Sequence, residues 1–179
     1  MAVQYSDWFN ETQPAITITN PPIKHPWGKD TKNRKTAKAT LTLTDFGIGD
    51  VCRMMTVKIN DRINAMYISS TGASTATLLD IGVYIAGLAH DGAVIDADEF
   101  ASAFDVNAGV NRTECMLESG ATVVGRRNMP VWEICGYASE AAARAAVGPG
   151  GEIDICVTAT AAVATASEVI VLEVEGAFS

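Results

Sequence analysis

The most constraining feature of this sequence is a succession of short segments in which apolar and polar residues alternate. Residues 40–44 read TLTLT, and within 77–85 an aliphatic residue recurs at every second position from Leu79 to Ile85. A period of two belongs to strands that bury one face. Turn-forming Gly, Asn, Asp or Ser residues separate the segments. The segments that we predict as strands are 40–44, 51–59, 62–68, 77–85, 93–95, 121–124, 131–135, 152–159 and 168–174.

The connections between these strands suggest simple neighbouring pairs. Asn60 and Asp61 predict a two-residue hairpin turn between the second and third strands. The last two strands are expected to pair with each other through a loop at 161–167. In the third strand, strict alternation places Ile63 on the face opposite Met66 and Ile68. The pattern therefore predicts an antiparallel β-sandwich or jelly-roll-like domain.

Helix is expected at two places only. Residues 98–103 predict one helical turn that Asp98 caps. Residues 139–146 predict a true helix, because Ser139 suits the N-cap, alanines follow it, and the sequence GPGG at 148–151 ends it. The fold class that we predict is all-β, with one short helix and an extended N-terminal arm.

The arm covers residues 1–35, and the β-sandwich domain covers 36–179. Prolines at 14, 21, 22 and 26 oppose helix in the arm. Residues 15–19 (AITIT) alternate and can add a strand to a sheet edge, either that of the same chain or that of a neighbour. The first 38 residues carry a net charge of +3 and the remainder −11, which together give the −8 of the chain. A basic arm on an acidic body is typical of an extension that grips a partner.

Composition and patterning exclude several classes of protein. Charged residues make up 19% of the 179 residues, too few for intrinsic disorder. The acidic body and the absence of an aromatic stacking platform argue against a nucleic-acid partner. The most apolar run, 153–172, contains Asp154 and Glu168, so no membrane partner is expected. The start of the chain lacks the basic and apolar pattern of a secretory signal.

Few residues in the sequence suggest chemistry. The two histidines are His25, in the arm, and His90, which we expect to be an exposed turn residue; no Gly-x-Ser-x-Gly motif accompanies them. Cysteines at 52, 115, 135 and 156 are isolated and are predicted to be buried, reduced thiols. We therefore predict no catalytic residues, no cofactor and no enzymatic activity.

The densest group of carboxylates comprises Asp91, Asp96, Asp98 and Glu99. Calcium favours such clusters, which makes the three aspartates weak candidates for a metal site. The spacing of the helix-loop-helix calcium motif is absent, and an acidic turn explains the same residues. We predict no metal.

Several segments resemble small virion structural proteins of tailed bacteriophages. They are NDRINAMYISS from residue 60, TLLDIGVY from 77, DGAVIDADEFASAFD from 91, MPVWEICGYAS from 129 and GEIDICVTAT from 151. The resemblance covers about residues 36–175, and the alanine-rich helix departs from it. It implies a capsid decoration or cement protein, commonly a homotrimer, that binds the major capsid protein on the outer surface of the virion and is made in the host cytoplasm.

With this resemblance, the arm becomes the expected clamp on the capsid. The arm residues that we predict to bind the partner are Ile16, Ile18, Pro21, Pro22, Lys24, Trp27, Lys29, Lys32, Arg34 and Lys35. One alternative is a tail or head-fibre module that binds host-surface glycan through an exposed aromatic patch, with Trp27, Tyr84 or Trp132 as its members. The other is a hydrolase with an unrecognised site, which the scarcity of histidine disfavours.

Overall fold

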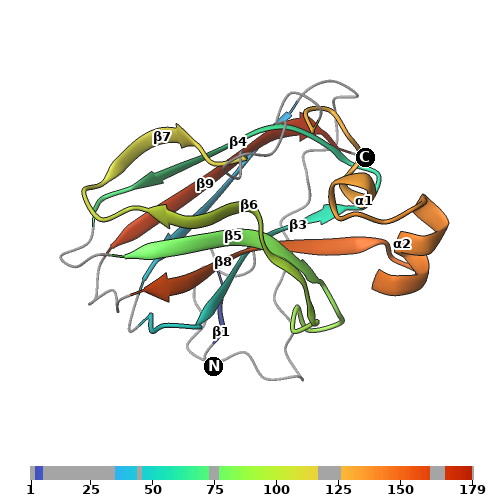
Figure 1. Ribbon diagram of the computed structural model, residues 1–179, viewed down its shortest axis with the longest axis horizontal. Coiled ribbons are helices and arrows are strands. Elements are labelled where there is room, and N and C mark those ends of the chain that lie inside the picture. Colours follow the sequence, from blue (N-terminus) through green and yellow to red (C-terminus); the bar gives the residue numbers. More distant parts are fainter. Residues whose placement is uncertain are drawn as a thin grey trace.

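The chain folds into two β-sheets that face each other, with two helices at one end (Figure 1). This computed structural model describes residues 3–5, 35–43, 46–72, 77–116, 126–161 and 168–178, with the backbone alone at 3–5 and at Lys35. The predicted all-β sandwich is confirmed. The strands are β1 (Val3–Tyr5), β2 (Lys35–Thr42), β3 (Val51–Lys58), β4 (Arg62–Ser70), β5 (Leu78–Ile85), β6 (Val94–Asp105), β7 (Val110–Glu114), β8 (Glu152–Ala161) and β9 (Val169–Ala177), and the helices are α1 (Val131–Ile134) and α2 (Glu140–Val147).

The strand order shows a nested pattern of pairs. One sheet has five strands in the order β1-β3-β8-β5-β6, and the other has four in the order β2-β9-β4-β7. β2 pairs with β9, β3 with β8, β4 with β7 and β5 with β6, all antiparallel. The chain thus runs out and back as one long two-stranded ribbon, and successive pairs of strands along it lie alternately in the two sheets. β1 is an addition, parallel to β3 at the outer edge of the five-stranded sheet.

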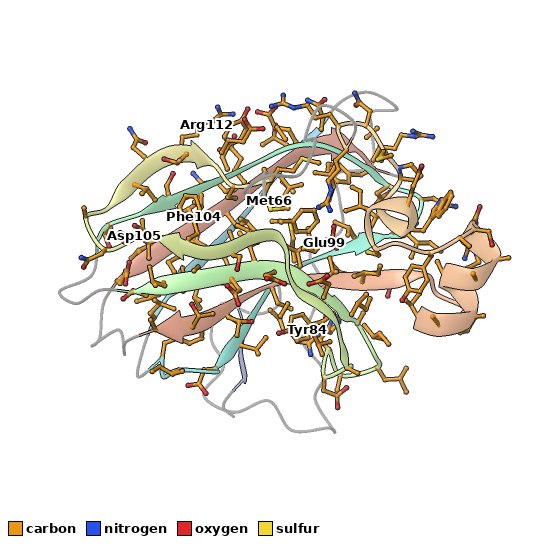
Figure 2. The ribbon with its side chains drawn as sticks, in the orientation of Figure 1. Met66, Tyr84, Glu99, Phe104, Asp105 and Arg112 are labelled. Carbon is orange, nitrogen blue, oxygen red and sulfur yellow. The ribbon has the colours of Figure 1, made fainter. Side chains whose placement is uncertain are left out.

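The hydrophobic core lies between the two sheets, because alternate residues of each strand point into it. In β2, Ala37, Ala39 and Leu41 are buried, whereas Thr36 and Lys38 are exposed. Figure 2 shows Met66 between the sheets and Arg112 and Tyr84 on opposite outer sides. Each fully buried large apolar side chain in this layer stabilises the fold by about 1.5–3 kcal/mol.

The predicted hairpin at Asn60 and Asp61 is wrong, since β3 and β4 lie in different sheets. The chain does turn there: the Asp61 carboxylate accepts a hydrogen bond from the backbone N–H of Lys58 at 2.7 Å, and the Asp61 N–H donates to the Lys58 carbonyl at 3.0 Å. This buried aspartate carries the chain from one sheet to the other. Alternation identifies strands but does not identify their partners.

The predicted pairing of the last two strands is wrong for the same reason. β8 lies between β3 and β5, whereas β9 lies between β2 and β4 in the opposite sheet. Of the connection predicted at 161–167, Ala161 ends β8 and residues 162–167 lie outside the described residues. Both strands are central, which fits their aliphatic composition better than an edge hairpin would.

The helical turn predicted at 98–103 is wrong, because these residues belong to β6. Glu99 and the two alanines favour helix locally and Asp98 suits an N-cap, but pairing with β5 overrides that preference. The pairing is irregular, with three register shifts along β5. Ala103 has φ of +49° and its N–H donates to Asp80 Oδ1 at 2.8 Å. β6 is therefore one long, bulged strand that includes residues 94 and 95 of the short strand expected at 93–95.

The strand predicted at 131–135 is also wrong, and the segment forms α1. Val131 and Ile134 are buried three positions apart, a spacing that suits one face of a helix. Pro130 precedes the first helical residue, and the N–H of Val131 donates to the Asp61 carbonyl at 2.9 Å. The chain therefore has two helices among its described residues instead of one.

The helix predicted at 139–146 is confirmed as α2. Ser139 Oγ accepts a hydrogen bond from the Ala142 N–H at 3.2 Å, the N-cap contact that its position suggested. Gly148, with φ of +99°, ends the helix. Both helices belong to the connection between β7 and β8 and lie together at one end of the sandwich (Figure 1).

Two details of the strands differ from simple alternation. In β4 a register shift between Ile63 and Ala65 reverses the side-chain phase, so that Ile63 shares the core with Met66 and Ile68, contrary to the prediction. β1 and β7 have no counterpart among the predicted strands. β7 is short and mostly exposed, so its sequence lacks the alternation of a half-buried strand. The predicted strands at 15–19 and 121–124 lie outside the described residues.

Candidate partner-binding edges and a buried polar cluster

The arm residues predicted to bind a partner are largely outside the described part of the chain. Lys35 is the first residue of β2, and its backbone pairs with Gly176. The other nine, from Ile16 to Arg34, lie outside the described residues. Their role as a clamp stays a prediction.

The acidic candidates for a metal do not converge on a common point. Asp91 is exposed in the turn before β6, while Asp96 and Asp98 lie within β6. Partial burial, and then the nearby Asp98 carboxyl, raise the pKa of Asp96. In the described ranges, no group of three or more His, Cys, Asp or Glu side chains is placed to hold a metal ion.

A buried polar cluster lies on the outer side of the five-stranded sheet and centres on Asp154 of β8. Its carboxylate accepts a hydrogen bond from Thr56 Oγ1 at 2.6 Å, lies 2.9 Å from His90 Nδ1 and lies 3.4 Å from a guanidinium nitrogen of Arg53. Asp154 is fully buried and His90 is 2% exposed. The prediction that His90 is an exposed turn residue is therefore wrong.

The same Arg53 side chain fixes both ends of the turn between β5 and β6. Its guanidinium donates to the carbonyl of Ile85 at 3.2 Å and to that of Gly92 at 2.8 Å, and it lies 4.9 Å from the centre of the Tyr84 ring. Any side chain at Gly92 would overlap the Ile85 backbone, so the chain passes very close there. The cluster anchors this turn to the sheet, a role in which buried charges confer conformational specificity.

The His90–Asp154 pair resembles part of a hydrolase triad, but its surroundings are those of a structural contact. The hydroxyl of Thr56 donates to the aspartate carboxylate, and the turn covers the pair. A substrate would reach it only if the turn opened. Sequence reasoning missed the cluster, although an aspartate within the apolar run of β8 was a signal for a buried partner.

The turn that this cluster anchors presents an apolar tip. Leu88 is 98% exposed there. Beside it lies a hollow of about 310 Å³, lined in part by Ala86, Val147 and Pro149, between this turn and the end of α2.

The outer face of the four-stranded sheet is charged and solvated. Arg112 lies 3.0 Å from Glu173 and 2.6 Å from Glu175, and its guanidinium stacks 3.8 Å from the centre of the Tyr67 ring (Figure 2). Exposed ion pairs of this kind contribute about 0–1 kcal/mol. The face therefore keeps the sheet soluble more than it stabilises it.

The thiols have the burial expected of inert residues. Cys52, Cys115 and Cys156 are buried, as predicted, and Cys135 is half-buried; none of the four is in a disulfide. Burial raises the pKa of the Cys135 thiol to about 12 and raises those of Cys115 and Cys156 as well. Such thiols are poor nucleophiles at neutral pH.

Two of the three aromatic residues considered for glycan binding do not form an exposed platform. Tyr84 is 7% exposed and donates or accepts a hydrogen bond with Thr158 at 3.1 Å. Trp132 packs against the core from α1. Trp27 lies outside the described residues.

The outer strands of the two sheets differ in regularity. β2 pairs with β9 over eight consecutive residues without a register shift. β6 has three register shifts, β7 is five residues long with one shift, and β1 is three residues long. Short and bulged edges resist the addition of further strands, whereas a long regular edge accepts them. Among the described outer strands, β2 has the longest unbroken register.

Comparison with known proteins identifies the fold only. No protein-family model and no curated protein matches the chain. Among solved structures, a chain of the capsid of Ralstonia phage GP4 is similar over 99% of both chains, with 13% identity and a TM-score of 0.60. A chain of the cyanophage Pam1 capsid asymmetric unit is similar at 12% identity, over 93% of this chain and 100% of that one, with a TM-score of 0.46. In the described residues no helix is long and apolar enough to span a membrane.

Proposed function

We propose that this chain is a non-enzymatic structural protein of a tailed-phage virion that decorates the outer surface of the capsid. The observation that carries the proposal is the match to the GP4 capsid chain, which covers 99% of both chains. Two chains that match almost end to end are of similar length. The similar chain is therefore a small capsid component of about this size, as a decoration protein would be.

The strand order supports the finer proposal that the sandwich is a jelly roll. Two four-stranded sheets, β2-β9-β4-β7 and β3-β8-β5-β6, with the nested pairs described above, are the arrangement of an eight-stranded jelly roll. Viral capsid proteins commonly use this architecture. Fold alone does not define function, so the jelly roll supports the proposal without deciding it.

The division of charge supports a role for the arm as the clamp on the major capsid protein. The first 38 residues carry +3 and the body carries −11. An acidic body on the outer surface keeps particles soluble, and a basic arm is attracted to acidic capsid surface. Many copies on a symmetric shell, and three arms in each proposed homotrimer, turn weak individual contacts into strong attachment.

Purified particles provide the first test. Mass spectrometry should find hundreds of copies of the chain per particle, and cryo-electron microscopy should place its density on the outer side of the shell. A few to about a dozen copies at the tail or on a fibre would contradict the proposal and favour the glycan-binding alternative. Absence from particles would refute a virion role altogether.

Charge reversal in the arm tests the clamp. Changing Lys24, Lys29, Lys32 and Arg34 together to Glu should reduce occupancy on particles at least tenfold without lowering the unfolding temperature, since none of these positions lies in a described strand. Lys58→Glu, at an exposed cation of the body, is the control and should keep normal occupancy. Equal occupancy of the arm variant and the control would show that the arm cations do not hold the capsid.

A further inference from the structure

The hollow beside Leu88 lies between two walls that are each fixed by hydrogen bonds. One wall is the turn between β5 and β6, whose two ends are held by the guanidinium of Arg53. The other is the end of α2, where the N–H of Gly151 donates to the Gly148 carbonyl at 3.0 Å and the N–H of Ile59 donates to the Gly151 carbonyl at 2.8 Å. The hollow, of about 310 Å³, is therefore a preformed feature of the fold.

The walls of the hollow are largely apolar. Ala86, Val147 and Pro149 line it with carbon atoms, and the glycines beside them add no side chains. Leu88 forms one lip, with its side chain 98% exposed. Covering such a leucine is favourable, because apolar surface leaves water. A small molecule in the hollow would leave most of this lip in water, whereas a protein surface that spans the hollow would cover both.

The charged groups around the hollow are mostly negative. Glu152 belongs to its lining, and Oδ1 of Asp91 lies 3.0 Å from the point where a Cβ on Gly87, another lining residue, would stand. The C-terminal end of α2 adds partial negative charge from the helix dipole. The cation on this helix, Arg144, lies 2.9 Å from Glu140, so the two together add no net charge. The hollow therefore combines apolar walls with a negative rim.

This combination matches the side chain of lysine. The four-carbon stem of a lysine packs on apolar surface while its ammonium group stays at a polar rim. The negative groups here are separate from one another, namely the carboxylates of Asp91 and Glu152 and the end of α2. A compact charge with three donors suits separate acceptors better than the planar fork of arginine, which matches a single carboxylate.

We propose that this hollow receives a lysine side chain of a different protein, and that Leu88 packs on the surface around that lysine. A second copy of this chain is the poorer partner, since residues 39–179 carry a net charge of −11 and two such bodies repel each other. The inference rests on the proposed function, which supplies a neighbouring protein in the virion. It adds to the arm a contact that the body itself makes.

Carbodiimide cross-linking of purified particles tests the contact, because this reagent joins a carboxylate to a lysine amine only where the two meet. Mass spectrometry should find Asp91 or Glu152 joined to a lysine of a different protein. Glu133, an exposed carboxylate on α1, is the matched control and should give at least tenfold less product. Links only to another copy of this chain, equal yields at Glu133, or no link at Asp91 and Glu152 would each overturn the proposal.

Substitutions separate the negative rim from the apolar lip. Asp91→Lys places a like charge beside the incoming ammonium and should reduce occupancy on particles at least tenfold. Glu133→Lys makes the same change of charge away from the hollow and should leave occupancy unchanged. Leu88→Ser removes the apolar lip and should reduce occupancy severalfold. All three positions are exposed, so the unfolding temperatures should stay close to that of the unaltered protein. Equal occupancy of all three variants would refute the proposal.

A lysine peptide tests the hollow without particles. In nuclear magnetic resonance titrations of the full-length protein, the peptide acetyl-Gly-Ala-Lys-Ala-Gly-amide should shift the amide signals of Gly87, Leu88 and Gly150. The same peptide with norleucine, which has the stem without the charge, should bind at least tenfold more weakly. If the lysine peptide shifts these signals but particles lack the chain, the inference stands and the proposed function fails. If particles carry the chain but the lysine peptide shifts none of these signals, the proposed function stands and the inference fails.

Discussion

β2 and β6 are both outer strands, but they lie in different sheets and are held in place by different means. β2 pairs with β9 in an unbroken register, and its buried and exposed residues alternate strictly. β6 pairs with β5 through three register shifts, and the turn between them is tied to the sheet by Arg53 and His90. A regular outer strand is held in place by its backbone pairing and alternating burial. An irregular outer strand depends in addition on contacts of particular side chains and on glycines where the backbones approach closely. The β6 side should therefore be sensitive to single substitutions that have no equivalent on the β2 side.

The largest effect on stability is expected at Asp154, the centre of the cluster that holds the turn between β5 and β6. Asp154→Asn removes the negative charge that faces Arg53 and His90 in a fully buried position, and it should destabilise the protein by about 3–5 kcal/mol, because a buried charge is left without its partner. Urea unfolding measures the change. Thr158→Ala, four residues further along the same face, is the control and should cost about 1 kcal/mol. Similar losses of unfolding free energy for both variants would show that the Asp154 cluster contributes no more to stability than an ordinary hydrogen bond.

A somewhat smaller effect is expected at Gly82 of β5. A Cβ at this position would overlap the backbone of Asp96 and Ala97, where the bulge of β6 folds over β5. Gly82→Ala should cost about 3 kcal/mol, since backbone cannot move aside as a flexible side chain can. Gly47→Ala, where the nearest atom lies at an ordinary contact distance of 3.4 Å, should leave the thermal midpoint within a few degrees. A tolerated Gly82→Ala would mean that β6 does not approach β5 so closely.

On β2, the alternation itself can be tested with proline. Ala39→Pro should cost about 2 kcal/mol more than Lys38→Pro, because the N–H of Ala39 bonds to β9 while that of Lys38 points to the outer edge. Thermal unfolding of the two variants gives the difference directly. The reverse order would place the hydrogen bonds between β2 and β9 in the opposite phase.

The smallest effect concerns Glu168, which directly precedes β9 and whose carbonyl accepts a hydrogen bond from the N–H of Leu43, just after β2. Its carboxylate oxygens have no hydrogen-bond partner among the described residues, and burial raises the pKa of its carboxyl. A raised pKa means that the folded state favours the protonated carboxyl. As far as this group is concerned, the protein is therefore most stable below the ordinary carboxyl pKa, and it loses this stability as pH rises through the raised value. Glu168→Gln should therefore raise the unfolding midpoint at pH 7, and the gain should vanish on acidification to about pH 4.

The pH dependence separates this effect from a general change in packing. A gain that persists unchanged at low pH would show that the charge of Glu168 is not its cause. Glu175→Gln, at a carboxylate that is paired with Arg112 on the solvated face, is the control and should give no gain at pH 7.

The sequence predicted most strands but few of their partners. The segments at 51–59, 62–68 and 77–85 are strands, as their alternation indicated, and Ser139 caps the predicted helix. The errors at 98–103 and 131–135 arose where local preference and pattern disagreed with the environment. In the first, pairing with β5 overrides helix-favouring residues; in the second, two buried positions three apart fit a helical turn as well as an irregular strand.

The candidate sites were only partly accessible to sequence reasoning. The basic arm and the alternating segment at 15–19 are visible in the sequence, because charge and period are local properties. The buried contact of His90 with Asp154 was not, since the two residues are 64 positions apart and meet only when the turn folds over β8. The place of β2 as an outer strand likewise depends on which strands lie beside it.

The sequence by itself determined the strands, the capped helix and the separation of a basic arm from an acidic body. Each follows from interactions between residues a few positions apart, or from composition. The tertiary structure alone decided that the strands pair in a nested order across two sheets, that a histidine in a turn is buried, and that β2 remains a regular outer edge. The physical reason is that a period of two specifies which face of a strand is buried, but the choice of neighbour depends on packing between residues far apart in the chain.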